Sequence, residues 1–194
     1  MGADGTAQGH CYGIEDDAPG ACGAGGLSVG FDYVNFANVC FRQSGEANRL
    51  RFGFCRLTGY AKDYCVKSSG AGCEVQFFNT TVDSCYGGAS LSAGRLLAIN
   101  STFFGNQNDG VRVDGAATTA QLASSTFCRN GRAVSFNSAG AVSFYSVLSV
   151  DNDHEVDFSC ENVGSVLSYD DNYTCDGIFG AGAEPTLAYR QILG

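Results

Sequence analysis

A pair of residues, hydrophobic in nearly every copy, recurs seven times along this chain at almost constant spacing. Each pair has its members at positions i and i+2, and successive pairs lie 22 or 23 residues apart. The pairs are Val29/Phe31, Phe52/Phe54, Val75/Phe77, Leu97/Ile99, Ala120/Leu122, Val142/Phe144 and Ser165/Leu167. Residues at i and i+2 of a strand point to the same face, and a fixed period of this length is typical of solenoids. The spacing therefore predicts a stack of coils with one strand for each pair.

A second series keeps step with the first, at intervals of 22 or 23 residues. Its members are Ala89/Leu91, Val111/Val113, Val134/Phe136 and Val156/Phe158. Between the two series the chain bends, and Phe103 is the residue expected to point inward there. Three short strands and three turns use about 22 residues, so one period makes one coil. We therefore predict an all-β fold, a right-handed parallel β-helix (β-solenoid) of about seven coils of 22–23 residues.

Other repeat and β folds fit this pattern less well. A helical solenoid requires apolar residues at a period of 3.6, which is absent here. A β-sandwich has irregularly spaced strands and no second series in phase with the first. Asn106, Asn130 and Asn152 fall at related positions of successive periods, which predicts a ladder of side-chain amides through one turn.

The phrases Ile99-Asn100-Ser101-Thr102-Phe103-Phe104-Gly105-Asn106 and Ser124-Ser125-Thr126-Phe127-Cys128-Arg129-Asn130 belong to this repeat. With the period, they resemble the right-handed parallel β-helix, or pectin-lyase-like, superfamily, and especially its surface-protein repeats. The resemblance covers about Leu27 to Gly180. It implies the fold, but that superfamily contains lyases, hydrolases, epimerases, phage spikes and adhesins. Residues 27–180 are the expected β-helix domain, 1–26 an N-terminal cap or tail, and 181–194 a C-terminal cap segment covering the open core.

Composition narrows the classes of partner. The chain of 194 residues carries a net charge of −9, which disfavours nucleic acid and anionic membrane surfaces. No apolar run approaches the roughly 20 residues of a membrane-spanning helix. We therefore expect no nucleic acid and no membrane insertion. The outward residues described below favour an extracellular polysaccharide or surface glycan as the partner.

The cysteines indicate an oxidising compartment. There are ten of them with only two histidines and no Cys-x-x-Cys pair, which favours disulfides over zinc or free thiols. Within two coils, the expected mutual partners are Cys55, Cys65, Cys73 and Cys85. Three sequons, beginning at Asn79, Asn100 and Asn172, predict glycosylation. We expect a secreted or cell-surface protein, and because residues 1–26 do not read as a signal peptide, a mature or truncated piece of one.

Residues at equal distances from the repeated pair become neighbours in a coil stack. Ten positions beyond Ile99, Leu122 and Phe144 lie Asp109, Arg132 and His154, and thirteen positions beyond lie Arg112, Ser135 and Asp157. These six side chains are expected in two adjacent outward columns. As catalytic candidates, the acids, arginines and histidine (Asp109, Arg112, Arg132, His154 and Asp157) suit general acid–base cleavage of a sugar chain.

Two readings compete with catalysis for this patch. Opposite charges on adjacent coils also form an exposed salt-bridge ladder worth about 0–1 kcal/mol per pair, and this structural reading is the one the sequence favours. A row of short hydrogen-bonding groups also suits sugar binding, and the expected binding residues are Arg112, Asp114, Ser135, Asn137 and Asp157. The chain lacks the Asn-Thr-Asp, Gly-His-Gly and Tyr-Gly-x-Asp-Pro-His phrases associated with polygalacturonase-like and epimerase-like members.

Aromatic platforms and metal ligands give further hypotheses. Tyr145, Tyr169 and Tyr173 would suit sugar stacking, although half-buried packing is the favoured interpretation of each. The pairs Asp151/Asp153 and Asp170/Asp171 offer oxygen ligands for calcium, but no complete calcium loop is present, so solvated acidic turns are favoured and no cofactor is expected.

The sequence thus predicts an extracellular β-helix that acts as a recognition or structural module and binds glycan. The alternative is a carbohydrate-active enzyme, either a polysaccharide lyase or a glycoside hydrolase. A third class is a structural spacer within a larger assembly.

Overall fold

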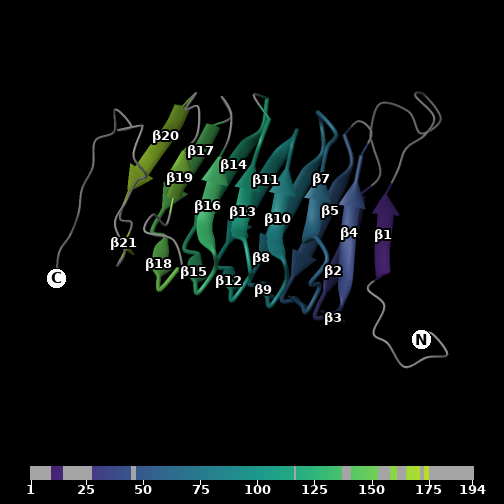
Figure 1. The fold of residues 1–194 in the computed structure, drawn as a ribbon. Coiled ribbons are helices and arrows are strands. Elements are labelled where there is room, and N and C mark those ends of the chain that lie inside the picture. Colours follow the sequence, from purple (N-terminus) through teal and green to yellow (C-terminus); the bar gives the residue numbers. More distant parts are fainter. Residues whose placement is uncertain are drawn as a thin grey trace.

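The computed structural model describes residues 10–14, 28–44, 47–115, 117–136, 141–152, 158–160, 165–170 and 173–174. In this part of the chain the regular elements are all strands. They wind into a parallel β-solenoid with three sheets, each of seven strands (Figure 1). Strand β1 lies at one end of the stack, and β20 and β21 lie at the other (Figure 1). The predicted fold class is confirmed.

Successive coils contribute one strand to each sheet. Sheet A consists of β1 (His10–Ile14), β4 (Val39–Gln43), β7 (Tyr64–Ser68), β10 (Gly87–Leu91), β13 (Asp109–Val113), β16 (Arg132–Phe136) and β19 (Phe158–Cys160). Sheet B consists of β2 (Ser28–Asp32), β5 (Arg49–Gly53), β8 (Glu74–Phe78), β11 (Arg95–Ile99), β14 (Thr119–Ala123), β17 (Ala141–Tyr145) and β20 (Ser165–Asp170). Sheet C consists of β3 (Asn35–Ala37), β6 (Arg56–Thr58), β9 (Thr81–Asp83), β12 (Thr102–Phe104), β15 (Thr126–Cys128), β18 (Leu148–Val150) and β21 (Tyr173–Thr174).

About five turns of the stack are described in full, slightly fewer than the seven expected, although each sheet contains seven strands. The outermost strands belong to coils of which the structure describes only parts. The strands described together with their side chains run from β2 to β15 and include the start of β16. Strand β1 pairs with β4 and extends sheet A. The rest of the expected N-terminal cap, and the whole expected C-terminal segment 181–194, lie outside the described residues.

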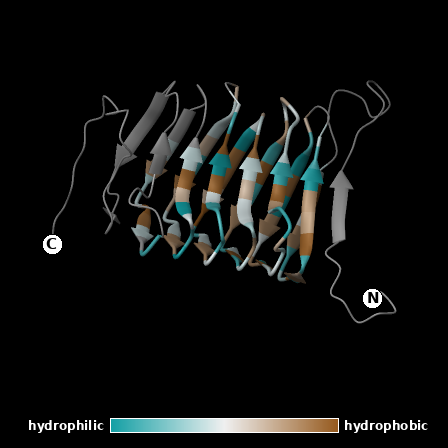
Figure 2. Ribbon diagram, in the orientation of Figure 1, coloured by the Kyte–Doolittle hydropathy of each residue, from teal (hydrophilic) through white to brown (hydrophobic). Residues whose placement is uncertain are grey.

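The core is a column of apolar side chains from all three sheets. In sheet B, Phe52 pairs with Phe77 on the next coil and their rings stack with centroids 5.4 Å apart. In sheet C, Phe103 pairs with Phe127 and the ring centroids are 4.9 Å apart. All four rings are fully buried, and hydrophobic segments recur on the strands of successive coils (Figure 2). Burial of such side chains contributes about 1.5–3 kcal/mol each.

One of the predicted inward pairs in sheet B is out of register by one residue. Leu96 and Ala98 point into the core where Leu97 and Ile99 were expected, because Ala98 pairs with Phe77 on one side and Leu122 on the other. The bulkier Leu97 and Ile99 are the half-buried neighbours. A shift of one residue along a strand exchanges its two faces. Small Ala98 therefore occupies the core position.

The expected pair Phe52/Phe54 is shifted by two residues. The buried pair is Leu50/Phe52, whereas Phe54 lies in the following bend and is 51% exposed. A left-handed backbone at Phe54, with φ of 51°, turns the chain from sheet B to sheet C and places the ring outside.

Two predicted pairs near the C-terminal end are also wrong. Phe158 pairs with Val134, so Val156/Phe158 is two residues out of step with the second series. In β20, Val166 pairs with Val142, and a register shift then brings Tyr169 opposite Phe144. The expected pair Ser165/Leu167 therefore does not continue the column, because Ser165 pairs with Ala141 ahead of the shift and the shift passes over Leu167.

Left-handed residues form the two bends that flank sheet C. Within each coil they lie five residues apart, at positions 33/38, 54/59, 79/84, 100/105, 124/129 and 146/151. The nine from Tyr33 to Ser124 each donate a backbone N–H to a carbonyl of the coil that follows, as Asn79 does to Ile99 at 3.1 Å and Ser84 to Phe104 at 3.0 Å. These bends hold sheet C at a fixed length, so coils differ in length elsewhere.

The predicted amide ladder runs through the bend between sheets C and A. Asn106 donates its side-chain amide to Oδ1 of Asn130 at 2.8 Å, and Asn130 donates in turn to Oδ1 of Asn152 at 3.1 Å. The backbone N–H groups of Asn106 and Asn130 also donate to these oxygens. Buried amides satisfy one another from coil to coil, as a buried polar group requires.

A matching ladder of hydroxyl groups fills the bend between sheets B and C. Ser101 Oγ accepts from the backbone N–H of Thr80 at 3.3 Å, and Ser125 Oγ accepts from Ser101 at 3.2 Å. Both serines are buried and each donates to a backbone carbonyl two residues back. The two interior corners next to sheet C are therefore polar and hydrogen-bonded.

One of the expected cysteine pairings is present. Cys65 and Cys85 form a disulfide between neighbouring coils, with the two Cα atoms 6.3 Å apart. Cys55, which was expected in the same group, is buried as a free thiol. The disulfide spans 20 residues of sequence, so it links the turn before β10 to strand β7.

Candidate functional site

The outer face of sheet A carries a cluster centred on Tyr64 and Asp109. Tyr64 begins β7, Gly87 is its partner in β10, and Asp109 begins β13. A Cβ atom at Gly87 would lie 2.3 Å from the Tyr64 ring, so the ring lies directly over that glycine. The Tyr64 hydroxyl reaches past it and donates a hydrogen bond to Asp109 Oδ2. One side chain thereby links three successive coils.

Asp109 is directed away from the core but is fully buried. The Cα–Cβ direction at the next residue, Gly110, points to the Phe127 and Phe103 rings, so alternation turns Asp109 the opposite way. Arg132, its register partner in β16, donates from Nε to Asp109 Oδ1 at 2.7 Å. The Asp109 carboxylate is thus enclosed between a phenol and a guanidinium, and the exposed salt-bridge ladder expected here is a buried ion pair.

The environment of Tyr64 opposes its ionisation. Burial raises the pKa of the phenol, and the hydrogen bond to Asp109 and the charge of Asp109 raise it further, although Arg112 opposes the shift. Burial by itself would lower the pKa of Arg112, but contacts with Asp114 and Tyr64 outweigh it and the pKa is raised. Arg112 Nε donates to both carboxylate oxygens of Asp114, at 2.8 and 2.9 Å. Tyr64 therefore remains a neutral donor beside a charged arginine.

An exposed rim surrounds this buried centre. Tyr86 is 38% exposed and packs edge-on against Tyr64, with ring centroids 5.9 Å apart. Asn108 Nδ2 lies 3.4 Å from each of the two tyrosine hydroxyls, and its Oδ1 accepts from Arg132 at 3.3 Å. We call these seven residues the sheet A cluster: Tyr64, Tyr86, Asn108, Asp109, Arg112, Asp114 and Arg132.

The structure brings together part of the predicted patch. Ser135 pairs with Arg112, as expected, but its other partner is Ser159 and not Asp157. The hydroxyl of Ser135 is buried and has no hydrogen-bond partner in the part of the chain that the structure describes. Asn137, His154 and Asp157 lie outside the described residues. Ser159 therefore takes the place in this column that was expected for Asp157.

Sequence reasoning missed Tyr64, Tyr86 and Asn108. A signal for them exists, because the three lie 22 residues apart in succession, which is the period of the repeat. Their contacts join one coil to the next. Because Tyr64 and Tyr86 lie outside the series of inward-pointing residues, however, the sequence gives no indication of which face of the sheet they occupy. The glycine at position 87 decides that Tyr64 lies over the sheet.

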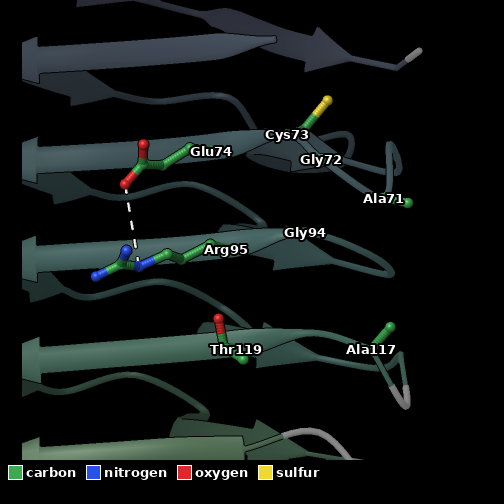
Figure 3. A pocket seen from close by; sticks show the side chains of 8 residues that line it. All are labelled: Ala71, Gly72, Cys73, Glu74, Gly94, Arg95, Ala117 and Thr119. Carbon is green, nitrogen blue, oxygen red and sulfur yellow. Dashed lines mark ion pairs between the residues drawn. The ribbon is translucent and has the colours of Figure 1, made fainter. Parts of the chain in front are cut away.

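A shallow pocket of about 230 Å³ lies beside the loops that join sheet A to sheet B (Figure 3). Its wall is made of small residues from three successive loops and of the first residues of β8, β11 and β14, namely Ala71, Gly72, Cys73, Glu74, Gly94, Arg95, Ala117 and Thr119. Glu74 pairs with Arg49 at 2.9 Å and with Arg95 at 4.0 Å. Arg95 also donates to Gln121 at 2.7 Å. The polar side chains at its rim are therefore engaged with one another along sheet B.

A second buried carboxylate lies on sheet C. Asp83 accepts two hydrogen bonds from Arg56, at 2.7 and 3.1 Å, and one from Thr58 at 2.6 Å. Burial raises the pKa of Asp83, but the hydrogen bonds and the charge of Arg56 outweigh it, so the pKa is lowered. Asp63 is similar: burial raises its pKa, and Lys67, the Tyr64 backbone N–H and Arg42 together lower it below its ordinary value. Both carboxylates are held in the ionised form.

The remaining candidate residues are distributed over other faces. Tyr145 is 41% exposed at the end of β17 in sheet B, so it is not fully packed away, while Tyr169 belongs to β20, whose side chains are not described. Asn79 and Asn100 are both exposed, and Asn172 lies outside the described residues. Tyr173 begins β21 and pairs with Leu148.

Within the described residues, no group of three or more histidine, cysteine, aspartate or glutamate side chains is arranged to hold a metal ion. Of the calcium candidates, Asp151 is exposed, and Asp153 and Asp171 lie outside the described residues. The described residues contain no helix long and apolar enough to cross a membrane.

The fold and this surface define a disulfide-containing parallel β-solenoid with a polar cluster on one sheet. Comparison with family models, with curated proteins and with solved structures finds no match to the chain. The function must therefore be inferred from the site itself.

Proposed function

We propose that this protein is an extracellular β-helix module of the pectin-lyase-like superfamily that binds glycan through the outer face of sheet A. The proposal rests on the sheet A cluster, in which half-buried hydrogen-bonding groups lie beside an exposed aromatic ring. Sugars are bound by such combinations, because their hydroxyl groups need directional partners and their C–H faces pack on aromatic rings. The Tyr86 ring supplies the platform, and Asn108, Arg112 and Asp114 supply donors and acceptors.

The state of Asp109 is the observation that favours binding over catalysis. An acid catalyst must reach the substrate, yet Asp109 is fully buried and accepts from both Tyr64 and Arg132. Such a carboxylate positions its neighbours. Asp109 holds Arg132 in place directly, and it holds the Tyr64 ring against which Tyr86 packs. Side chains held rigidly in this way lose less conformational entropy when a ligand binds.

The alternative is a carbohydrate-active enzyme, a polysaccharide lyase or a glycoside hydrolase. Its supporting observation is the contact of the Tyr64 phenol with the Asp109 carboxylate and the Arg112 guanidinium, because these are types of group that general acid–base cleavage uses. A hydrolase also requires a second carboxylate about 5–10 Å from the acid. His154 and Asp157, the remaining sequence candidates for this alternative, lie outside the described residues.

An extracellular location is part of the proposal. The Cys65–Cys85 disulfide supports it, since such bonds persist mainly in oxidising compartments. The sequons at exposed Asn79 and Asn100 agree with the same compartment.

A glycan array probed with the full chain tests the proposal, with Tyr86→Ala and Arg112→Ala as site variants. We expect the wild type to bind a defined set of glycans and each variant to bind them about tenfold more weakly, a change of about 1.4 kcal/mol. Tyr145→Ala removes a similarly exposed tyrosine from sheet B and serves as the matched control. Equal loss with Tyr145→Ala would contradict the assignment to sheet A.

Reducing-end and unsaturated-product assays on the same glycans separate the two functions. Turnover that Tyr64→Phe abolishes while the fold stays intact would establish the enzyme. The absence of both binding and turnover would favour a structural spacer.

A further inference from the structure

Six exposed side chains form a row along the bend between sheets B and C. They are the left-handed residues Tyr33, Phe54, Asn79, Asn100, Ser124 and Ser146. Each of the first five donates its backbone N–H to the following coil, so the side chains project side by side at the spacing of neighbouring strands, about 4.8 Å. Two residues of this row, Asn79 and Asn100, begin sequons.

The two asparagines differ in the state of their amide nitrogens. Asn100 Nδ2, the atom that N-glycosylation modifies, donates to Asn79 Oδ1. The Nδ2 atom of Asn79 has no hydrogen-bond partner within the described residues. The folded chain therefore directs one reactive nitrogen at its neighbour and leaves the other open to solvent.

Phe54 lies next to Asn79 in the same row. One face of its ring stacks on Tyr33, with centroids 4.9 Å apart and an interplanar angle of 8°. Stacking along the row leaves the opposite ring face on the side of Asn79, and Phe54 is 51% exposed. A sugar attached at Asn79 would therefore meet an aromatic face that is suited to its C–H groups.

We propose that Asn79 is the glycosylated member of this pair, that its first sugar packs on Phe54, and that Asn100 stays unmodified in the folded protein. In the transfer, Asn79 Nδ2 attacks the anomeric carbon of a lipid-diphosphate-linked oligosaccharide. The C–N bond forms as the bond to the diphosphate oxygen breaks, and the amide proton is lost to solvent. A second glycan on Asn100 would compete for the same space one strand spacing away, because a pyranose ring is wider than that spacing. The inference is independent of the proposed binding face on sheet A.

Glycopeptide mass spectrometry tests this on the full chain secreted by a eukaryotic host. In the folded, secreted fraction we expect Asn79 to be occupied at least tenfold more often than Asn100. Thr81→Ala and Thr102→Ala form a matched pair, since each removes one sequon from the same column of sheet C. Thr81→Ala should remove the glycan of this row, and Thr102→Ala should leave it unchanged. Molecules that carry both glycans, equal occupancy of the two sites, or an unmodified Asn79 would overturn the proposal.

A second measurement tests the role of Phe54. The Tm of protein made with and without N-glycosylation is compared in the wild type and in Phe54→Ala, so that the intrinsic effect of the substitution cancels. We expect the glycan to raise the Tm of the wild type by several degrees, and expect that increase to disappear in Phe54→Ala. An equal increase in both proteins would show that the sugar does not pack on this ring.

Discussion

The Tyr64 hydroxyl donates a hydrogen bond to Asp109 across an intervening coil, because Gly87 leaves room for the ring between them. This contact and the Arg132–Asp109 ion pair make the start of sheet A a connected polar unit. Parallel coils otherwise interact only with their immediate neighbours. A side chain that spans two coils therefore adds cooperativity where the proposed binding face lies.

The phenol of Tyr64 makes the stability of the folded protein depend on pH in the alkaline range. The pKa of Tyr64 is raised in the folded state by burial and by Asp109, so its contribution to stability is complete below the unfolded pKa of about 10 and is lost as the pH rises through the folded value. Urea unfolding should show Tyr64→Phe to be less stable than the wild type by about 1–3 kcal/mol at pH 7. The difference should shrink between pH 10 and 11. A difference that stays constant would contradict this account.

Asp83 makes the stability of the folded protein depend on pH in the acidic range as well. Its pKa is lowered in the folded state because Arg56 and Thr58 outweigh the effect of burial. The resulting stability is present above the unfolded pKa of about 3.9 and is lost as the pH falls through the folded value. The wild type should therefore have a higher free energy of unfolding than Asp83→Asn, and this difference should decrease below pH 4. Asp114→Asn, which alters a carboxylate on sheet A, is the comparison variant. Loss of the acid dependence in Asp114→Asn but not in Asp83→Asn would refute the assignment.

The amide ladder predicts a large cost for removing its central member. Asn130 is fully buried, accepts from Asn106 and donates to the Phe103 carbonyl at 3.0 Å. Asn130→Ala should lower the free energy of unfolding by about 3 kcal/mol, since several buried groups lose their partners. Gln107→Ala, an exposed position in the neighbouring turn, should change it by less than about 0.5 kcal/mol. Chemical denaturation measures both, and equal effects would argue against the ladder.

The corrected register of sheet B is testable with two phenylalanines. Phe77 is fully buried, whereas Phe54 is 51% exposed. Phe77→Ala should cost about 3–5 kcal/mol through lost burial and a cavity. Phe54→Ala should cost less than about 1 kcal/mol, because only its stacking on Tyr33 is lost. Thermal unfolding distinguishes the two, and similar destabilisation would restore the pair first expected from the sequence.

The Cys65–Cys85 disulfide closes a loop of 20 residues. In the chain-entropy model, a loop of this size contributes about 3 kcal/mol to stability. Substitution of both Cys65 and Cys85 by alanine should lower the free energy of unfolding by about 3 kcal/mol. Cys55→Ala, which removes a buried free thiol, is the control without a crosslink, and peptide mapping under non-reducing conditions should identify the linked pair. A mapped link from Cys65 to any other cysteine would contradict the structure.

Much of the fold is predictable because the period repeats the same physical demand on every coil. Phe103 and the amides of Asn106, Asn130 and Asn152 were identified correctly, since the left-handed residues on either side of sheet C keep a constant spacing. The error at Leu97 and Ile99 follows the loop from β10 to β11, which is shorter than the loops from sheet A to sheet B on the neighbouring coils. Spacing and bulk then favour Leu97 and Ile99, although Leu96 and Ala98 fill the core.

The candidate site was predicted only in part. Asp109 and Arg132, and Arg112 and Ser135, are register neighbours as expected. Sequence reasoning had no means to show that Tyr64 covers Asp109, because that contact depends on the missing side chain of Gly87 and on a hydroxyl that reaches across two coils.

Repetition of short apolar strands determined the architecture, since each coil buries its hydrophobic face only by stacking on the next. The tertiary structure decided which member of each strand faces inward and which carboxylates are enclosed. Those outcomes depend on small differences in loop length and on contacts between residues more than twenty positions apart, such as Arg56 with Asp83. A periodic pattern specifies neighbours on average, whereas burial and hydrogen bonding are settled atom by atom when the coils pack.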